Sequence, residues 1–226
     1  MIYKNGAKEI AQQHGKSITF MAKPDHTWIG SSCHIHSSLW DTDGSHSLFP
    51  GDDPHEPSEL FGHYLGGLTA HMRELSVFVA PTINSYKRWV AESWAPTTLA
   101  WGRDNRTCGF RLVGHGDGIR IESRIPGADM NPYLGFAAML AAGLDGIENA
   151  SDPGPELVGN AYAAGEAEPF PSSLREAVDG WEGSAFAKRA FGEDVWRHYL
   201  NYGRTEQRLF DEVVTDYERV RMFERG

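Results

Sequence analysis

One short stretch of the sequence, residues 30–38 (GSSCHIHSS), carries side chains that could bind a metal or a polar ligand. Alternate side chains of a strand share a face, so His34, His36 and Ser38 would point together. Two imidazoles and a hydroxyl on one face can hold a cation and a polar ligand. Taken alone, the motif is equally compatible with a pair of histidines that binds nothing.

A second stretch, residues 120–124 (RIESR), alternates charged side chains in the same way. Arg120, Glu122 and Arg124 would share one strand face, while isoleucines on the other face indicate packing on a core. Alone, this pattern is more often an ion-pair ladder between strands. On a strand that lines a cleft, the same charges would face a ligand.

Arginines gather in parts of this otherwise acidic chain. Residues 101–111 hold three of them, and Arg88 lies in an earlier loop. Guanidinium groups bind phosphate and carboxylate through two parallel hydrogen bonds, although most loop arginines are simply solvated. If His34 and Glu122 are ligands of one divalent cation, the surrounding arginines indicate nucleotide phosphates and phosphoryl transfer.

The composition narrows the function further. The chain has 226 residues, of which 31 are acidic and 21 are Lys or Arg, for a formal net charge of −10. This balance argues against nucleic acid and against a membrane surface as partners. Two cysteines, Cys33 and Cys108, do not form a disulfide framework, and no apolar run is long enough to span a bilayer. We therefore predict a cytoplasmic protein.

The elements that must position these residues are strands early in the chain and helices late. Strands are expected at 17–22, 33–40, 98–102, 108–113 and 118–125, and helices at 8–14, 58–79, from Asn131, and over 172–224 with a break at Gly192. Asn131 and Pro132 are typical of a helix start. In that helix, Phe136 and Leu140 are expected to be buried. The pattern predicts an α+β fold with an antiparallel sheet flanked by helices.

Five motifs, in their order, resemble the C-terminal catalytic half of glutamine synthetase. They are residues 16–24 (KSITFMAKP), 30–38, 84–88 (NSYKR), 95–111 (APTTLAWGRDNRTCGFR) and 120–134 (RIESRIPGADMNPYL). Residues 173–225 are similar to the terminal helices of that family. The resemblance implies one incomplete catalytic domain over residues 1–226, with the sheet and the motifs in 1–150 and helices in 151–226.

The resemblance also implies a role for each matching position. The ligands of one divalent metal, Mg²⁺ or Mn²⁺, would be His34 and Glu122. The contacts to ATP would be His36, Ser38, Arg111 and Arg120. The contacts to glutamate would be Gly30, Arg88 and Arg124. Arg106 would stabilise the transferring phosphoryl group. The implied reaction forms γ-glutamyl phosphate from ATP and glutamate, and ammonia or an amine then attacks it. Family members assemble as homo-oligomeric rings.

The sequence departs from the family pattern at three points. Trp94 stands where ammonia-using members carry a glutamate that binds and deprotonates ammonium, so a bulkier amine is expected in its pocket. Ile29 replaces an asparagine before the first glycine motif. The early segment that supplies most metal-binding glutamates in the family is not matched, so the chain alone is expected to be weak or inactive.

Two other interpretations remain at this stage. The chain could be a catalytically inactive fragment or a regulatory paralogue of the same fold. A metal-dependent β-barrel enzyme of the cupin type is suggested by His34, His36 and Asp41. That interpretation is weak, because no second histidine motif follows and the last third of the chain is helical.

Overall fold

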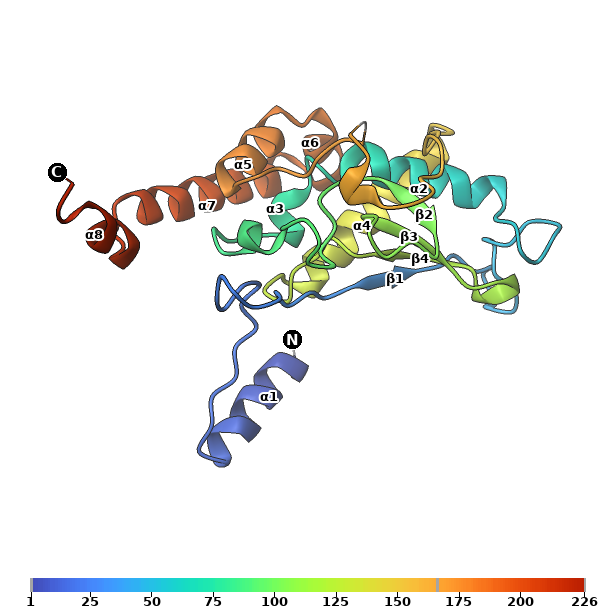
Figure 1. The fold of residues 1–226 in the computed structure, drawn as a ribbon. Coiled ribbons are helices and arrows are strands. Elements are labelled where there is room, and N and C mark those ends of the chain that lie inside the picture. The colour runs from blue at the N-terminus through green and yellow to red at the C-terminus, as the bar shows by residue number, and fades with distance from the viewer. Residues whose placement is uncertain (1, 166, 226) are drawn as a thin grey trace.

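A four-stranded sheet forms the centre of the computed structural model, which describes residues 2–165 and 167–225 (Figure 1). The strands lie in the order β1 (Ile35–Ser37), β4 (Arg120–Ser123), β3 (Phe110–Val113) and β2 (Trp101–Arg103). β4 pairs antiparallel with both β1 and β3, whereas β2 and β3 are parallel. The expectation of an antiparallel sheet is therefore corrected to a mixed one.

The parallel pair arises from a short return between β2 and β3. Asp104, directly after β2, has a φ of 51°, in the left-handed region. Residues 104–109 carry the chain back, so the amide of Phe110 donates to the carbonyl of Ala100 (3.1 Å). Parallel strands usually need a longer crossover, but these strands are only three and four residues long.

The strands are shorter than expected, and one of them does not form. Residues 17–22 are irregular rather than a strand, although the Ala22 carbonyl accepts a hydrogen bond from the amide of Ser31 (2.8 Å). This segment pairs with none of the described strands, so its alternating pattern has no ladder to join.

Two helices, α2 (Glu59–His71) and α4 (Pro132–Glu148), cover one face of the sheet. The core between these layers contains Ile35, Phe110 and Ile121 from the strands and Leu65, Leu68 and Met139 from the helices. Alternate residues of β1, β3 and β4 therefore face the core, and the residues between them face the opposite side.

Glycines bring α2 and α4 into close contact. A Cβ at Gly67 would lie 2.0 Å from the carbonyl oxygen of Ala142, and a Cβ at Gly143 would lie 2.2 Å from the ring of Tyr64. α4 thus buries its small residues. Met139 is buried as well, but other large side chains point away, and Phe136 and Leu140 are 49% and 48% exposed. The expectation that these two residues are buried is therefore wrong.

The remaining helices flank this body (Figure 1). The single helix expected over 58–79 is two, because the chain turns before α3 (Ser76–Val79). The C-terminal helices are α5 (Leu174–Gly183), α6 (Ala185–Phe191), α7 (Glu193–Asp211) and α8 (Asp216–Met222), and Gly192 separates α6 from α7 with a φ of 84°. Short 3-10 helices are η1 (Ser85–Arg88), η2 (Gly116–Gly118) and η3 (Ala161–Ala163).

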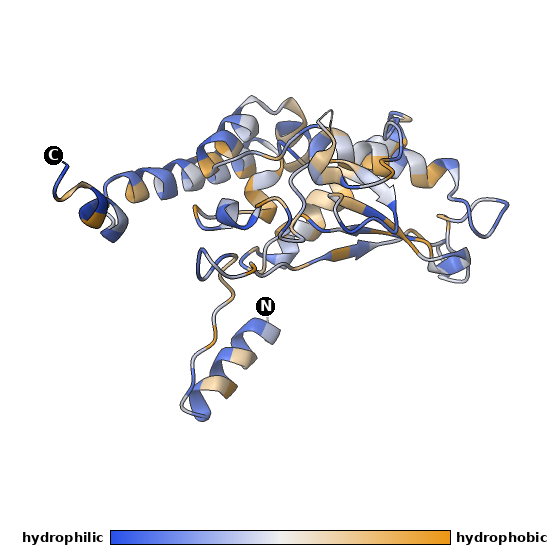
Figure 2. Ribbon diagram, viewed as in Figure 1, coloured by the Kyte–Doolittle hydropathy of each residue, from blue (hydrophilic) through white to orange (hydrophobic). Residues whose placement is uncertain are grey.

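Helix α1 (Ile2–Gln13) stands apart from the rest at the end of an irregular segment (Figure 1). Its Lys4 ammonium donates to the carbonyls of Ala128 and Met130, which attaches the helix to the loop before α4. Figure 2 shows that α7 and α8 alternate hydrophilic and hydrophobic residues. None of the described helices is both long and apolar enough to cross a membrane.

Candidate functional site

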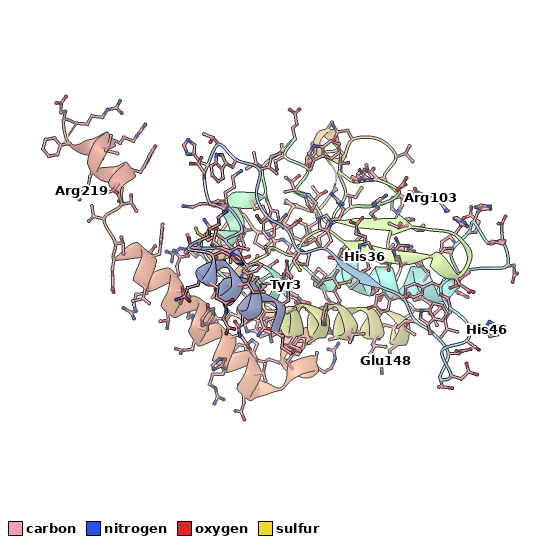
Figure 3. The ribbon with its side chains drawn as sticks, turned by 90° about the horizontal axis from the view of Figure 1, so that it is seen from below. Tyr3, His36, His46, Arg103, Glu148 and Arg219 are labelled. Carbon is pink, nitrogen blue, oxygen red and sulfur yellow. The ribbon has the colours of Figure 1, made fainter. Side chains whose placement is uncertain are left out.

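The open face of the sheet carries a row of charged side chains at its centre. The strand register places His36 opposite Glu122, and Glu122 opposite Arg111. These three residues are out of phase with the core-facing isoleucines, so they share the face that α2 and α4 leave uncovered. Figure 3 labels His36 on its strand. The alternation in the sequence thus positions the functional row.

Glu122 is the hub of this row and is only 4% exposed. Its Oε1 lies 2.8 Å from the Nδ1 of His34 and accepts a hydrogen bond from the Nη1 of Arg124 at 3.1 Å. Its Oε2 accepts from the Nη1 of Arg111 at 2.9 Å. The histidine and the carboxylate expected to share a cation therefore do meet, 88 residues apart along the chain.

The surroundings keep Glu122 ionised. Burial raises the pKa of a carboxyl group, but the hydrogen bond from Arg111 and the charge of Arg124 outweigh it, and the pKa of Glu122 lies below its usual value. The pKa of His34 is also lowered, first by burial and then by the charge of Arg124. A neutral His34 that donates from Nδ1 to Glu122 keeps the lone pair of Nε2 for a cation or a ligand proton.

A cavity of about 340 Å³ opens directly above this hub. Its walls combine one carboxylate, one imidazole, three guanidinium groups and one indole. They belong to Glu122, His34, Arg106, Arg111, Arg124 and Trp94. Three arginines around one glutamate make the cavity locally cationic in an acidic protein, and such a cavity favours anionic ligands.

Trp94 belongs to a strained loop at the rim of the cavity. It is 60% exposed and has a φ of 62°, and Glu92 has a φ of 63°. Each such non-glycine residue costs of order 1–3 kcal/mol, and strained residues cluster at functional sites. The Tyr162 hydroxyl donates to the carbonyl of Ala95 at 3.0 Å, so the packing of this region holds the loop in place.

Three of the expected ATP contacts, His36, Ser38 and Arg120, are not among the residues that line the cavity. The Nε of Arg120 donates to the Nδ1 of His36 at 3.1 Å, which continues the polar row toward the sheet edge. The hydroxyl of Ser38 accepts from the Trp40 indole at 3.0 Å. Arg111, the fourth expected contact, does line the cavity.

Two of the expected glutamate contacts, Arg88 and Gly30, do not line the cavity either. Arg88 is 3% exposed, and its guanidinium donates to the carbonyl of Ile125. A Cβ at Gly30 would lie 2.5 Å from the Cγ of Arg88, so glycine leaves room for that side chain. Burial lowers the pKa of Arg88 to about 10, and the group stays cationic at neutral pH. The third, Arg124, reaches the cavity.

Two aspartates make contacts at the site that were not predicted from the sequence. Asp104 pairs with Arg111, and its Oδ1 accepts from the Nε at 2.9 Å. The parallel pairing of β2 and β3 brings these two residues together, and no sequence pattern indicated that pairing. Asp129 accepts hydrogen bonds from Thr82 and Ser85, in the turn before Arg88.

A larger cavity of about 700 Å³ lies between Leu99–Trp101 and loop residues 153, 155–158, 164, 165, 167 and 168. Its walls are mainly apolar, and the catalytic residue types converge at the smaller cavity, which we therefore take as the site. Among residues 2–165 and 167–225, no group of three or more His, Cys, Asp or Glu side chains is arranged to hold a metal ion.

Sheet, helices and site together define a glutamine synthetase catalytic domain. The family described as "glutamine synthetase, catalytic domain" matches residues 1–222, and the chain belongs to this family. A solved structure described as a GmaS/ADP complex superimposes with a TM-score of 0.89 and 36% identity, over 99% of this chain and 53% of that one.

The names of two curated relatives refer to an amine or to its amide. The gamma-glutamylethanolamide synthetase GlnA4 of Streptomyces coelicolor is 50% identical over 224 residues, which cover 99% of this chain and 47% of the relative. A glutamate–isopropylamine ligase of a Pseudomonas species is 42% identical, over 96% of this chain and 48% of the relative. The chain thus spans about half the length of the curated relatives it matches.

Proposed function

We propose that this chain provides the nucleotide- and glutamate-binding part of an ATP-dependent glutamate–amine ligase. ATP would phosphorylate the γ-carboxylate of glutamate, and an amine would then displace phosphate from the acyl phosphate. The observation that carries the proposal is the cavity in which Arg106, Arg111 and Arg124 surround the Glu122–His34 pair. Guanidinium groups that converge on one cavity stabilise the charge of a transferring phosphoryl group.

The binding roles divide along the row. Arg111 and Arg120, with His36 and Ser38, would contact ATP at the sheet side. Arg124, Arg88 and the backbone of Gly30 would hold glutamate. Arg106 is exposed at the rim of the cavity, so its guanidinium can reach the transferring phosphoryl group without breaking a buried ion pair. ADP in the GmaS complex, a relative at 36% identity, supports the nucleotide.

The residues present fit part of a site for Mg²⁺ or Mn²⁺. His34 and Glu122 would supply an imidazole nitrogen and a carboxylate oxygen, while Mg²⁺ prefers near-octahedral oxygen ligands. The other ligands would come from substrate phosphates, water or residues outside the described ones. When bound, the metal would neutralise phosphate charge. Without it, Arg111 and Arg124 balance the charge of Glu122.

The acceptor is proposed to be an organic amine. The Trp94 indole lines the cavity where ammonia-using members carry a carboxylate, and an indole neither binds ammonium by charge nor removes its proton. Its apolar face suits the alkyl part of an amine. The names of both curated relatives, with ethanolamide and isopropylamine, support this choice. The homo-oligomer that the resemblance implies stays a prediction.

A turnover assay tests the function. Phosphate release and γ-glutamyl amide formation are measured with ATP, Mg²⁺, glutamate and either ethanolamine, isopropylamine or ammonium. Arg106→Gln removes one exposed guanidinium at the cavity and should lower the rate about 100-fold or more. The matched control Arg197→Gln, on the exposed face of α7, should leave it unchanged. Trp94→Glu should raise the rate with ammonium relative to ethanolamine.

Calorimetric titration with ATP plus Mg²⁺, and separately with glutamate, covers the case of weak turnover. The proposal would be supported if the chain bound both ligands, if Arg106→Gln weakened ATP binding, and if Arg197→Gln left ATP binding unchanged. If the chain bound neither ligand, or if Arg106 and Arg197 variants behaved alike, the assignment of this cavity would be wrong.

A second candidate is a catalytically inactive member of the family. It is favoured by the hydrogen bonds that Arg111 and Arg124 make to both oxygens of Glu122, and by the lack of a fuller metal-ligand group among the described residues. Such a protein would bind nucleotide without consuming it. Nucleotide binding with no glutamate-dependent phosphate release, with any of the three amines, would identify this second function.

A further inference from the structure

The turn that carries Arg88 is tied to the loop after β4 by one carboxylate. The Oδ2 of Asp129 accepts a hydrogen bond from the hydroxyl of Ser85 at 2.6 Å and another from the hydroxyl of Thr82 at 3.0 Å. The same two hydroxyls lie 3.0 Å apart, and the Thr82 amide donates to the Ser85 hydroxyl at 3.0 Å. The network therefore uses one oxygen of Asp129, Oδ2, whereas Oδ1 is buried without a hydrogen-bond partner.

The far side of the turn is also fixed. Asn84 is the residue before η1, but its side chain does not cap that helix. Its amide instead pairs with the backbone of Lys23 in both directions, each at 2.8 Å. Because the Asn84 side chain is hydrogen-bonded to Lys23, the start of η1 is held by the hydroxyls of Thr82 and Ser85. Asp129 accepts hydrogen bonds from both hydroxyls and so holds η1 through them.

Asp129 sits close to the charge it helps to place. Arg88 ends η1 and is 3% exposed. Burial lowers the pKa of Arg88, and the charge of Asp129 is the largest influence that opposes this shift. The guanidinium of Arg88 donates to the carbonyl of Ile125, in the loop that also contains Asp129. A Cβ at Gly127 would lie 2.4 Å from the Oδ1 of Asp129, so the loop fits closely around the carboxylate.

We propose that Asp129 is a positioning residue for glutamate binding. Its two accepted hydrogen bonds hold the 82–88 turn against the 124–130 loop, and this fixes Arg88 relative to Arg124. The two arginines proposed to hold glutamate come from these two segments, so their spacing depends on that link. The part of this proposal that concerns glutamate binding rests on the proposed function. The link between the two segments is independent of it.

Hydrogen exchange tests the link without reference to activity. In Asp129→Ala, the amides of Ser85 and Lys87, which close the turn onto the carbonyls of Thr82 and Asn84, should exchange about tenfold faster or more. In Asp129→Asn the side-chain oxygen can still accept both hydrogen bonds, so exchange should stay near the wild-type rate. Asp117→Ala, an exposed aspartate in η2, is the control for lost charge and should change nothing.

Calorimetry tests the consequence for ligand binding. Asp129→Ala should weaken glutamate at least tenfold and leave ATP with Mg²⁺ nearly unchanged, and Asp129→Asn should restore most of the glutamate affinity. A purely structural role would weaken both ligands together. Unchanged exchange in Asp129→Ala, equal exchange in the Ala and Asn variants, or equal loss of both ligands would overturn the proposal.

The two proposals fail in different ways. If the wild-type chain bound no glutamate while Asp129→Ala still loosened the turn, the proposed function would be wrong and the link would stand. If wild type bound glutamate and Asp129→Ala bound it equally well, the positioning role would be wrong and the proposed function would stand.

Discussion

The contact between α2 and α4 yields the sharpest stability prediction, through the change Gly67→Ala. A Cβ at this position would lie 2.0 Å from the carbonyl oxygen of Ala142 and 2.7 Å from the amide nitrogen of Gly146. Both are backbone atoms, so no side chain can rotate away. Ordinary contacts lie at roughly 3.5–4.0 Å, and α4 would have to move by about 1.5 Å.

The expected cost follows from two opposing effects. Overpacking of a core costs about 1–3 kcal/mol and occasionally more, and a conflict between two backbones belongs at the upper end. Alanine in place of glycine within a helix returns about 1 kcal/mol. The net loss should be about 2–3 kcal/mol. At about 2–4 °C per kcal/mol for a chain of this size, the Tm should fall by roughly 5–10 °C.

A matched variant on the same helix separates the two effects. A Cβ at Gly62 would meet no atom within 4 Å, so Gly62→Ala gains helix propensity without a steric conflict. Its Tm should rise by about 2–3 °C. Melting curves by circular dichroism or calorimetry measure both. If Gly67→Ala melted at or above the wild-type temperature, α2 and α4 could not pack as closely as described.

Three further predictions concern charge and exposure. Glu122→Gln leaves Arg124 without its counter-charge and Arg111 with only the exposed Asp104 as a partner, and it should cost about 3–5 kcal/mol in urea unfolding. The same change at exposed Glu148 should stay within about 0.5 kcal/mol, and equal effects would contradict the described hub. Burial lowers the pKa of His71, but its hydrogen bonds to Glu74 and Asp145 outweigh burial and raise the pKa above 6.5. The stabilisation from protonated His71 is therefore complete below pH 6.5 and is lost as the pH rises through the raised pKa. The Tm difference between wild type and His71→Gln should therefore be larger at pH 6 than at pH 9, and a constant difference would refute this. Phe136→Ser should lower the free energy of unfolding by less than about 1 kcal/mol in the same urea assay, because half of that side chain is already exposed to water. A loss of about 3 kcal/mol or more would show that Phe136 is buried.

The alternating patterns were sufficient to predict the centre of the site. Because strand side chains alternate, the spacing of His34 and His36 and of Arg120, Glu122 and Arg124 predicted shared faces. The register in addition makes His36 and Glu122 cross-strand neighbours, which the spacing alone did not predict. The contact between His34 and Glu122 at 2.8 Å also agrees with the expected pair. Local periodicity thus determined which face the charges occupy.

Three features could not be predicted, for separate physical reasons. The parallel pairing of β2 and β3 depends on the left-handed backbone conformation of Asp104. Glycine is the usual sequence signal for that conformation, and this position has none. The contacts of Asp129 join residues 44 and 47 positions away, and no local pattern encodes such distances. The burial of α4 was misjudged because it has apolar residues on two faces, and the small ones allow the closer approach to α2.

The charge of the site differs in sign from that of the whole chain. The net charge is −10, yet three guanidinium groups and one carboxylate line the cavity. Exposed charges more than about 8–10 Å away are largely screened at physiological ionic strength, so a ligand in the cavity experiences mainly these local groups. Arg111 and Arg124 are held by Glu122, and Arg111 also by Asp104, so their forks are ordered before any anion arrives. Under the proposed function, Glu122 would fix the arginines that bind anions and would also present an oxygen beside His34 where a cation accompanies those anions.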